Sequence, residues 1–426
     1  MATKEATLVG KSLWRNRDFL ILWSGQAVSV LGTRVSALAL PLLVLDITHS
    51  PVQAGLLSSA RMIPYLVLGL PAGALLDRWN RKTTMIACDL GRALALGCVP
   101  LAWMLGFLSL AQLYLVALVQ GAAFVFFNVA EMASLPNVVA EEDLPQALAL
   151  DSFAGSAGAL VGPGLAGLII GAARTTVVGA VLAYLLDALS YVVSVVSLAF
   201  IRVPFQVERA PDGQKSLQAE VLEGLHFLWG HRPLRVMAFT SWSLSLLYAP
   251  VSLAMIVLAR GELGASPRAI GLIFSLSAVG GLIGASAAPH LKARFSSASL
   301  LIASVAVQAA ATLAVGFAPS ILVMTLGWAV AFACDPVFTS VSSSYRLAIT
   351  PDDLQGRVQS VYRMGGYGAE PLGMALGGFA LSIVGARTQI NVVAAGVGVV
   401  ALLLIWKLRS PGPTTEAKRK AKCFKR

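Results

Sequence analysis

The sequence predicts an all-α polytopic membrane protein in which twelve transmembrane helices form two six-helix bundles. Three observations carry this prediction: an apolar composition, long apolar runs without alternation, and one polar interval near the middle of the chain. Of the 426 residues, 57% are hydrophobic and 12% are charged, and the mean hydropathy is +0.77. Soluble domains are roughly 45–50% apolar and about 25% charged, so this composition is typical of a membrane protein.

Helical spans follow from the length of the apolar runs. A bilayer core about 30 Å thick requires roughly 20 apolar residues in a helix, and lipid offers no partner to open backbone groups. Barrel strands would alternate, and these runs do not. A cleavable signal is not expected, because the N-terminus is polar and the first apolar run is too long for a signal core. The expected spans are 19–45, 53–76, 83–107, 110–135, 146–172, 175–200, 235–259, 269–291, 297–317, 320–346, 363–385 and 388–408.

The basic residues set the expected orientation. With both termini in the cytoplasm, 24 of the 32 Lys and Arg residues lie in inner segments, four lie outside and four lie within spans. This asymmetry is the positive-inside signature. The net charge of +11 is therefore expected to face anionic lipid, with the bilayer as partner and no nucleic acid. The expected location is the plasma (inner) membrane with both termini cytoplasmic.

The longest polar interval, 201–234, divides the chain. It opens as a loop rich in charge, Pro and Gly and continues as LQAEVLEGLHFLWG, where Leu217, Val221, Leu225 and Leu228 share one helical face. That spacing predicts an amphipathic connector at the inner surface or against the bundle. The expected domains are an N-terminal segment 1–18, a bundle 19–200, a cytoplasmic linker 201–234, a bundle 235–408 and a basic tail 409–426.

The two halves resemble each other. VVAEEDLPQALALDSF (138–153) aligns with AITPDDLQGRVQSVYR (348–363), and each segment follows the fourth span of its half. A parallel internal repeat with its seam at mid-chain is typical of transporters, and it places the substrate path between the halves.

A charged turn, GALLDRWNRKTTMI (73–86), separates the second and third expected spans. Arg78, Arg81 and Lys82 hold this turn on the inner side. Asp77 can accept hydrogen bonds from the N-terminus of a neighbouring helix, where the helix dipole favours an anion. The sequence favours a conformational latch here, and an ordinary topogenic charge cluster is the alternative.

The turn resembles the signature of the major facilitator superfamily, Gly-x-Leu-x-Asp-Arg-x-x-Arg-Lys, and the resemblance covers essentially the whole chain. Asn80 stands where relatives often have Gly. The resemblance implies that the first, fourth, seventh and tenth helices line the cavity. It also implies that Asp77 meets the start of the eleventh helix, near Arg363, when the halves close on the inner side. The matching gate residues are Gly73, Leu75, Asp77, Arg78, Arg81 and Lys82.

The fifth expected span contains a second motif, GSAGALVGPGLAG (155–167). It resembles the antiporter signature of the family, Gly-x-x-x-Gly-Pro-x-x-Gly-Gly, with Ala166 in place of one Gly. Small residues four apart let two helices touch closely, and a proline bends a helix. This resemblance favours export over uptake. The matching residues are Gly158, Gly162, Pro163 and Gly167.

More loosely, the chain is similar to the branch that contains macrolide-efflux pumps and the enterobactin exporter. The similar segments include WRNRDFLILWSGQAVSVLG (14–32), SLPNVVAEEDLPQALAL (134–150) and EGLHFLWGHRPLR (223–235). This resemblance implies an amphiphilic small-molecule substrate of drug, macrolide or siderophore type.

Ionisable residues within spans are costly and are therefore functional candidates. Asp89 and Arg92, three apart on a helix, are expected to form a structural pair; Asp187 is expected to pack against a neighbouring helix, and Glu131 to belong to the gate. An acid in apolar surroundings is a candidate proton carrier. The candidates for a substrate or proton site are Asp335 and Glu370 as the acids and Arg34 and Arg61 as counter-charges.

The sequence lacks the usual enzyme motifs. It has no GxxxxGK[ST] phosphate loop, no cysteine or histidine set with metal-ligand spacing and no nucleophile elbow. No catalytic residue, cofactor or metal is expected, and the proton gradient is the expected energy source. The prediction is a proton-coupled exporter that works by alternating access as a monomer. The alternatives are an uptake permease or facilitator of the same fold and, more distantly, a non-transporting membrane sensor or scaffold.

Overall fold

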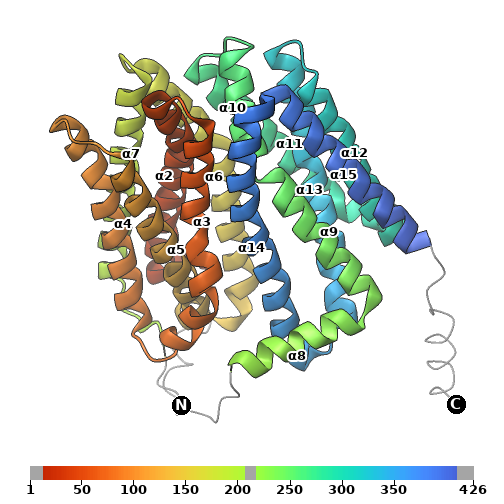
Figure 1. Ribbon diagram of the computed structural model, residues 1–426. Helices are drawn as coiled ribbons and strands as arrows, with labels where there is room; N and C mark the ends of the chain where they lie inside the picture. The colour runs from red at the N-terminus through yellow and green to blue at the C-terminus, as the bar shows by residue number, and fades with distance from the viewer. Residues whose placement is uncertain (1–12, 207–216, 410–426) are drawn as a thin grey trace, which may run out of the picture.

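The computed structural model describes residues 13–206 and 217–409, and in this part of the chain every regular element is a helix (Figure 1). The expected basic tail and most of the N-terminal segment lie outside the described residues, as does the loop 207–216 of the linker. The helices of the first half are η1 (Leu13–Arg15), α2 (Arg17–Thr48), α3 (Pro51–Leu76), α4 (Arg81–Met104), α5 (Leu110–Val138), η2 (Glu141–Asp143), α6 (Leu144–Ala172) and α7 (Thr176–Phe200).

The second half begins after α8 (Leu217–Gly230), which belongs to the linker. Its helices are α9 (Arg232–Tyr248), α10 (Val251–Gly261), α11 (Pro267–Arg294), α12 (Ser297–Gly316), α13 (Ile321–Ile349), α14 (Asp352–Val384) and α15 (Ala386–Arg409).

The length and hydropathy of the helices confirm the predicted fold class. Within residues 13–206 and 217–409, ten helical segments are long and apolar enough to cross a membrane, with α9 and α10 counted as one segment. Two further helices, α3 with 26 residues and α14 with 33, lie among them (Figure 1). The twelve spans thus form an all-α membrane fold of two six-helix bundles.

Short polar residues begin many of these helices. The side chains of Asn16, Ser50, Asn80, Ser109 and Thr175 accept a hydrogen bond from the backbone N–H three residues later. Such caps satisfy donors that have no partner within the helix. They explain why these five apolar runs begin as helices at their polar boundaries.

The seventh expected span, 235–259, is two helices rather than one. The break falls after Tyr248, and α10 restarts at Val251 behind Pro250. Proline has no N–H to donate and its ring clashes with the carbonyl four residues earlier, so a single continuous helix is not favoured here.

The ends of the spans define two faces of the molecule. The linker face carries the start of α2, the turn between α3 and α4, the end of α7 and the whole of α8. The opposite face carries the turns α2–α3, α6–α7 and α10–α11. In Figure 1 the linker face is at the bottom, where α8 crosses the ends of α14 and α9.

The linker helix α8 packs against the second half. Arg357 Nη1 on α14 donates to Glu223 Oε2 at 2.7 Å, and Gly224 lies against the Arg357 backbone. Leu228 is fully buried and Leu225 partly so, as the amphipathic pattern predicts. The side chains of Leu217 and Val221 lie outside the described residues. The helix therefore lies against the bundle, which is one of the two placements that the sequence left open.

Candidate functional site

The two bundles meet along two helix pairs, α3 with α14 and α6 with α11. Near the opposite face both contacts are made by glycines. Gly55 on α3 lies against the backbone of Gly378, and Gly167 on α6 lies against Gly271 and the Pro267 carbonyl. A side chain at any of these glycines would collide with backbone atoms across the interface. Both interfaces are therefore tightly closed in this half of the molecule.

The same helices are not in such contact near the linker face. A Cβ atom added at Gly69 or Gly73 on α3, or at Gly155 on α6, would meet no atom of the described residues within 4 Å. Each of these residues shares its helix with a tightly packed glycine of the opposite-face half. Gly73 is 18 residues, or five turns, from Gly55 and therefore lies on the same face of α3. Along this interface the bundles are thus closed near the opposite face and separated near the linker face.

An ion pair adds to the closure of the opposite face. Arg260 at the end of α10 donates to the carboxylate of Asp46 near the end of α2, so the pair joins the two bundles. Both side chains are partly exposed, so the pair contributes little stability in water. The pair is informative about the conformation, because it can form only while the opposite-face ends of α2 and α10 are close.

The antiporter-type motif lies where α6 touches two helices. On one side, Gly158 packs against Val30 of α2 and Gly162 packs against the backbone of Arg34. On the other side, the Pro163 carbonyl and Gly167 pack against Gly271 of α11. Small residues of α6 therefore allow two close helix contacts. One is with α2 within the first bundle, and the other is with α11 between the bundles.

One hydrogen bond crosses the α6–α11 contact. The backbone N–H of Gly164 donates to Ser275 Oγ on α11 at 2.8 Å. Pro163 precedes this residue, and a proline disturbs the hydrogen bonds of its own helix. Ser275 supplies an acceptor from the other bundle at this point. The sequence motif indicated a packing role for the segment, but it did not indicate Ser275 as the partner.

The basic residues of the turn between α3 and α4 bind the first bundle itself. Arg81 Nη1 donates to the Ala133 carbonyl at 2.7 Å, and Lys82 Nζ donates to the Ile201 carbonyl at 2.7 Å. These carbonyls lie at or near the C-terminal ends of α5 and α7, where the helix dipole favours a cation. Two of the four charges in the turn thus have a structural role within the bundle.

Asp77, the predicted latch, caps the end of α3 and is exposed. Among the described residues, no hydrogen bond or ion pair reaches its carboxylate. The contact with the start of α14 that the family resemblance implies is absent from this conformation, in which Gly73 also faces open space. The latch therefore stays a prediction for the state in which the linker face is closed.

A buried polar network lies inside the first bundle. Asp89 and Arg92 on α4 form the predicted ion pair, and Ser194 Oγ on α7 donates to Asp89 Oδ2 at 2.5 Å. The Arg92 guanidinium lies over the rings of Phe127 and Tyr191, at 4.5 and 4.4 Å from their centroids. Paired and enclosed in this way, these charges join α4, α5 and α7. The predicted pairing is confirmed, and its purely structural role stays a prediction.

Asp187 is fully buried at the contact between α7 and α2. Its Oδ1 accepts from Ser190 Oγ at 3.2 Å and lies close to Gly32 of α2, where no larger residue would fit. Arg61 of α3 is near enough to interact with it electrostatically. The expected packing role of Asp187 against a neighbouring helix is confirmed.

An aromatic cluster crosses the gap between the bundles at mid-depth. The ring of Tyr65 on α3 lies 5.1 Å from that of Phe124 on α5 and 5.0 Å from that of Tyr367 on α14. Arg363 Nη2 donates to the Tyr367 hydroxyl at 3.1 Å. We call Tyr65, Phe124 and Tyr367 the aromatic cluster. Sequence reasoning missed Tyr65 and Phe124, because only the packing of α3 between α5 and α14 brings them together.

The four predicted substrate or proton residues lie on four different helices. Glu370 is three residues beyond Tyr367 on α14. Arg34 is exposed on α2, and Asp335 is exposed midway along α13. Arg61 lines a small cavity of about 20 Å³ inside the first bundle. Within the described chain no ion pair joins any two of the four, so the structure does not bring them into direct contact.

A comparison with known families identifies the family of the chain. Residues 11–423 match the family described as transmembrane secretion effector, within the major facilitator superfamily. The chain belongs to this family. The proteins of this family are integral membrane transporters and not enzymes, and this protein is one of them. Among the described residues, no cluster of His, Cys, Asp or Glu could hold a metal ion.

The relatives of this superfamily member include named efflux pumps. It is 26% identical over 360 residues to the multidrug efflux pump Tap of Mycolicibacterium fortuitum, covering 82% of this chain and 85% of that protein. It is 24% identical over 266 residues to macrolide efflux protein A of Streptococcus pyogenes, covering 62% and 64%.

Solved structures share the fold. The nucleoside transporter NupG superimposes with a TM-score of 0.75 at 15% identity, covering 93% of this chain and all of that one. A bacterial homologue of the iron transporter ferroportin in its inward-facing state gives a TM-score of 0.72 at 18% identity, covering 93% of this chain and 99% of that one.

Proposed function

We propose that the protein is a proton-coupled exporter of amphiphilic small molecules that works by alternating access. In this proposal the linker face is cytoplasmic, and the membrane is the plasma membrane. The single observation that carries the proposal is the asymmetry of the bundle interfaces: glycines are in backbone contact near the opposite face and face open space near the linker face. A transporter that opens to the cytoplasm has this arrangement.

The reverse state follows from the same residues. If the bundles rock about the α3–α14 and α6–α11 contacts, the glycines near the opposite face separate and Gly73 approaches α14. Asp77 then reaches the N-terminal end of α14, where the helix dipole stabilises a carboxylate. The contact between Asp77 and α14 would exist in the outward-open state and not in the inward-open state. Such a difference shifts the equilibrium toward the outward-open state.

The substrate site of this proposal is the aromatic cluster with its charged neighbours. Flat or amphiphilic molecules would stack on Tyr65 and Tyr367, because aromatic rings offer large apolar area with a polar edge. Glu370 and Asp335 lie at mid-depth in spans, where a charge is tolerated only beside water or a partner. In the proposal Asp335 or Glu370 alternates between binding a proton and binding substrate, with Arg34 or Arg61 as the counter-charge.

Transport into proteoliposomes tests this function. Purified protein is reconstituted with an imposed pH gradient, and the movement of a labelled macrolide is followed. Wild-type protein is expected to move the macrolide against protons, and Asp335→Asn or Glu370→Gln to lose the dependence on the gradient. Glu142→Gln, an exposed acid at the linker face, serves as the matched control. Full gradient-driven export in both variants would exclude the proposed proton site, and movement together with protons would indicate uptake.

A further inference from the structure

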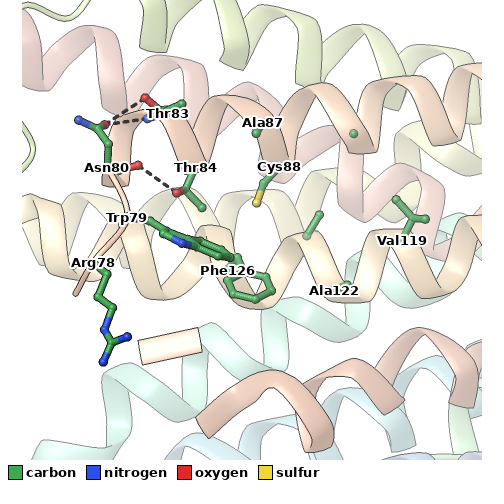
Figure 2. A pocket seen from close by; sticks show the side chains of 12 residues that line it. Arg78, Trp79, Asn80, Thr83, Thr84, Ala87, Cys88, Val119, Ala122 and Phe126 are labelled. Carbon is green, nitrogen blue, oxygen red and sulfur yellow. Dashed lines mark hydrogen bonds between the residues drawn. The ribbon is translucent and has the colours of Figure 1, made fainter. Parts of the chain in front are cut away.

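A groove of about 770 Å³ lies between α4 and α5 and reaches the turn after α3. Its volume is within the range of small-molecule sites, roughly 300–1,000 Å³. In Figure 2, Arg78, Trp79 and Phe126 lie near one end, and Ala122 lies farther along the groove. Small side chains form most of its deeper wall, including Gly91 and Ala122. The groove has no residue in common with the aromatic cluster or with the contacts between the bundles.

The groove opens toward the bilayer. On α4, Leu94 follows the groove residue Gly91 by three positions and is 66% exposed. On α5, Leu115 precedes the groove residue Val119 by four positions and is 63% exposed. Residues three or four apart share a helix face, and large apolar side chains exposed on a membrane-spanning helix face lipid. In Figure 1, α4 lies at the edge of the molecule that is remote from α9–α15.

The length of the groove along α4 matches the thickness of the hydrocarbon layer of one leaflet. It extends along α4 from the turn before Arg81 to Gly91, ten residues into the helix. At 1.5 Å per residue this is about 15 Å, which is half of a hydrocarbon core about 30 Å thick. A single acyl chain in the leaflet at the linker face would therefore run along the groove from the membrane surface to the midplane.

The polar end of the groove carries a positive charge. Arg78 is exposed there, and in the described part of the chain its guanidinium has no hydrogen bond or ion pair. No Asp or Glu lines the groove. Trp79 packs on Phe126 with their ring centroids 5.7 Å apart, and tryptophan is typical of the membrane interface. This end therefore suits an anionic head group at the membrane surface.

We propose that this groove binds an anionic phospholipid of the surrounding bilayer, with its phosphate at Arg78 and one acyl chain between α4 and α5. Basic sites beside transmembrane helices at the membrane surface select anionic lipids. The small residues of the wall leave the space for the chain, and the cation at the end selects the head group.

Lipid binding to the full-length protein in detergent tests the head-group site. Native mass spectrometry compares the affinity for phosphatidylglycerol with that for phosphatidylcholine. The wild-type protein is expected to prefer phosphatidylglycerol, and Arg78→Ala to lower that affinity about fivefold without changing the affinity for phosphatidylcholine. Arg294→Ala is the matched control, because Arg294 is exposed in the corresponding turn of the second half. Equal losses in both variants would overturn the proposal by indicating surface charge alone.

A second pair of variants tests the chain site. Gly91→Leu places a large side chain in the groove, and its Cβ atom would meet no described atom within 4 Å, so the helix backbone should tolerate the substitution. Gly97→Leu is the matched control, on the same helix with equal space and outside the groove. Gly91→Leu is expected to weaken the binding of both lipids, and Gly97→Leu to leave it unchanged. Equal lipid binding by the two variants would contradict the proposal, and so would a loss of macrolide affinity in Gly91→Leu with lipid binding intact.

Discussion

The backbone N–H of Gly164 donates to the Ser275 hydroxyl at 2.8 Å, so that one hydrogen bond joins the two bundles near the middle of α6. Other serines of α11 behave differently. Ser286 donates to the Leu282 carbonyl of its own helix at 2.9 Å. The Ser286 bond lies within one helix and does not depend on how the bundles are placed. The Gly164–Ser275 bond can form only in the state in which α6 and α11 are in contact.

Replacing Ser275 with alanine should destabilise this state. The substitution leaves the Gly164 N–H without its partner, which typically costs about 1–3 kcal/mol when the group is buried. Thermal unfolding of the purified protein is expected to begin at a lower temperature for Ser275→Ala. Ser286→Ala removes only an intrahelical bond and should unfold like the wild type. Identical unfolding curves for the two variants would show that the bond between the bundles has no net effect.

The two glycine environments of α6 predict opposite sensitivities. A methyl group at Gly167 would collide with α11, whereas one at Gly155 meets open space. Overpacking of about 1–3 kcal/mol corresponds to a rate change of roughly 5- to 150-fold when the crowded state is on the transport cycle. Gly167→Ala is expected to slow transport by a factor in this range in proteoliposomes, and Gly155→Ala to leave it unchanged. Equal rates would mean that the α6–α11 contact is not needed for turnover.

Removing one member of the buried ion pair should be more damaging than removing both. Asp89→Ala leaves Arg92 buried without a carboxylate, which costs roughly 3–5 kcal/mol. The double variant Asp89→Leu with Arg92→Met removes both charges and is expected to recover much of the loss. Size-exclusion profiles and unfolding temperatures in detergent measure both variants. A double variant less stable than Asp89→Ala would contradict a purely structural role.

The arginines of the α3–α4 turn should differ in their effect on stability. Arg81 donates to a helix-end carbonyl at 2.7 Å, whereas Arg78 is exposed. Hydrogen bonds that involve a charged group contribute about 1.5–3 kcal/mol, so Arg81→Ala should lower the unfolding temperature and Arg78→Ala should not. If Arg78→Ala proved the more destabilising of the two, the assignment of structural and lipid-facing roles within the turn would be wrong.

Much of the fold could be predicted because lipid imposes length and composition on each span. The twelve apolar runs, the linker helix and the Asp89–Arg92 pair all follow from local spacing. The break before Pro250 was visible in the sequence as a proline inside a span. It was missed because a proline within a membrane helix is often tolerated.

The candidate site was predicted less completely. Asp335 and Glu370 could be named as candidates because a charge within an apolar run is visible in the sequence, and their role stays a prediction. Tyr65 and Phe124 were missed because their proximity depends on the rotation and contact of three helices, which no local pattern records. Ser275 was missed for the same reason, since nothing distinguishes it in sequence from Ser286 on the same helix.

The most direct test of the account is a pair of distances measured by spin labels in a background without native cysteines. One pair, Gly73→Cys and Gly356→Cys, joins α3 to α14 near the linker face at positions with open space. The other, Ile47→Cys and Gly261→Cys, lies beside the Asp46–Arg260 ion pair at the opposite face. When Gly167→Leu blocks the α6–α11 contact, rocking bundles predict that the opposite-face distance lengthens and the linker-face distance shortens. Two distances that lengthen together, or a linker-face distance that does not change, would contradict alternating access by these two bundles.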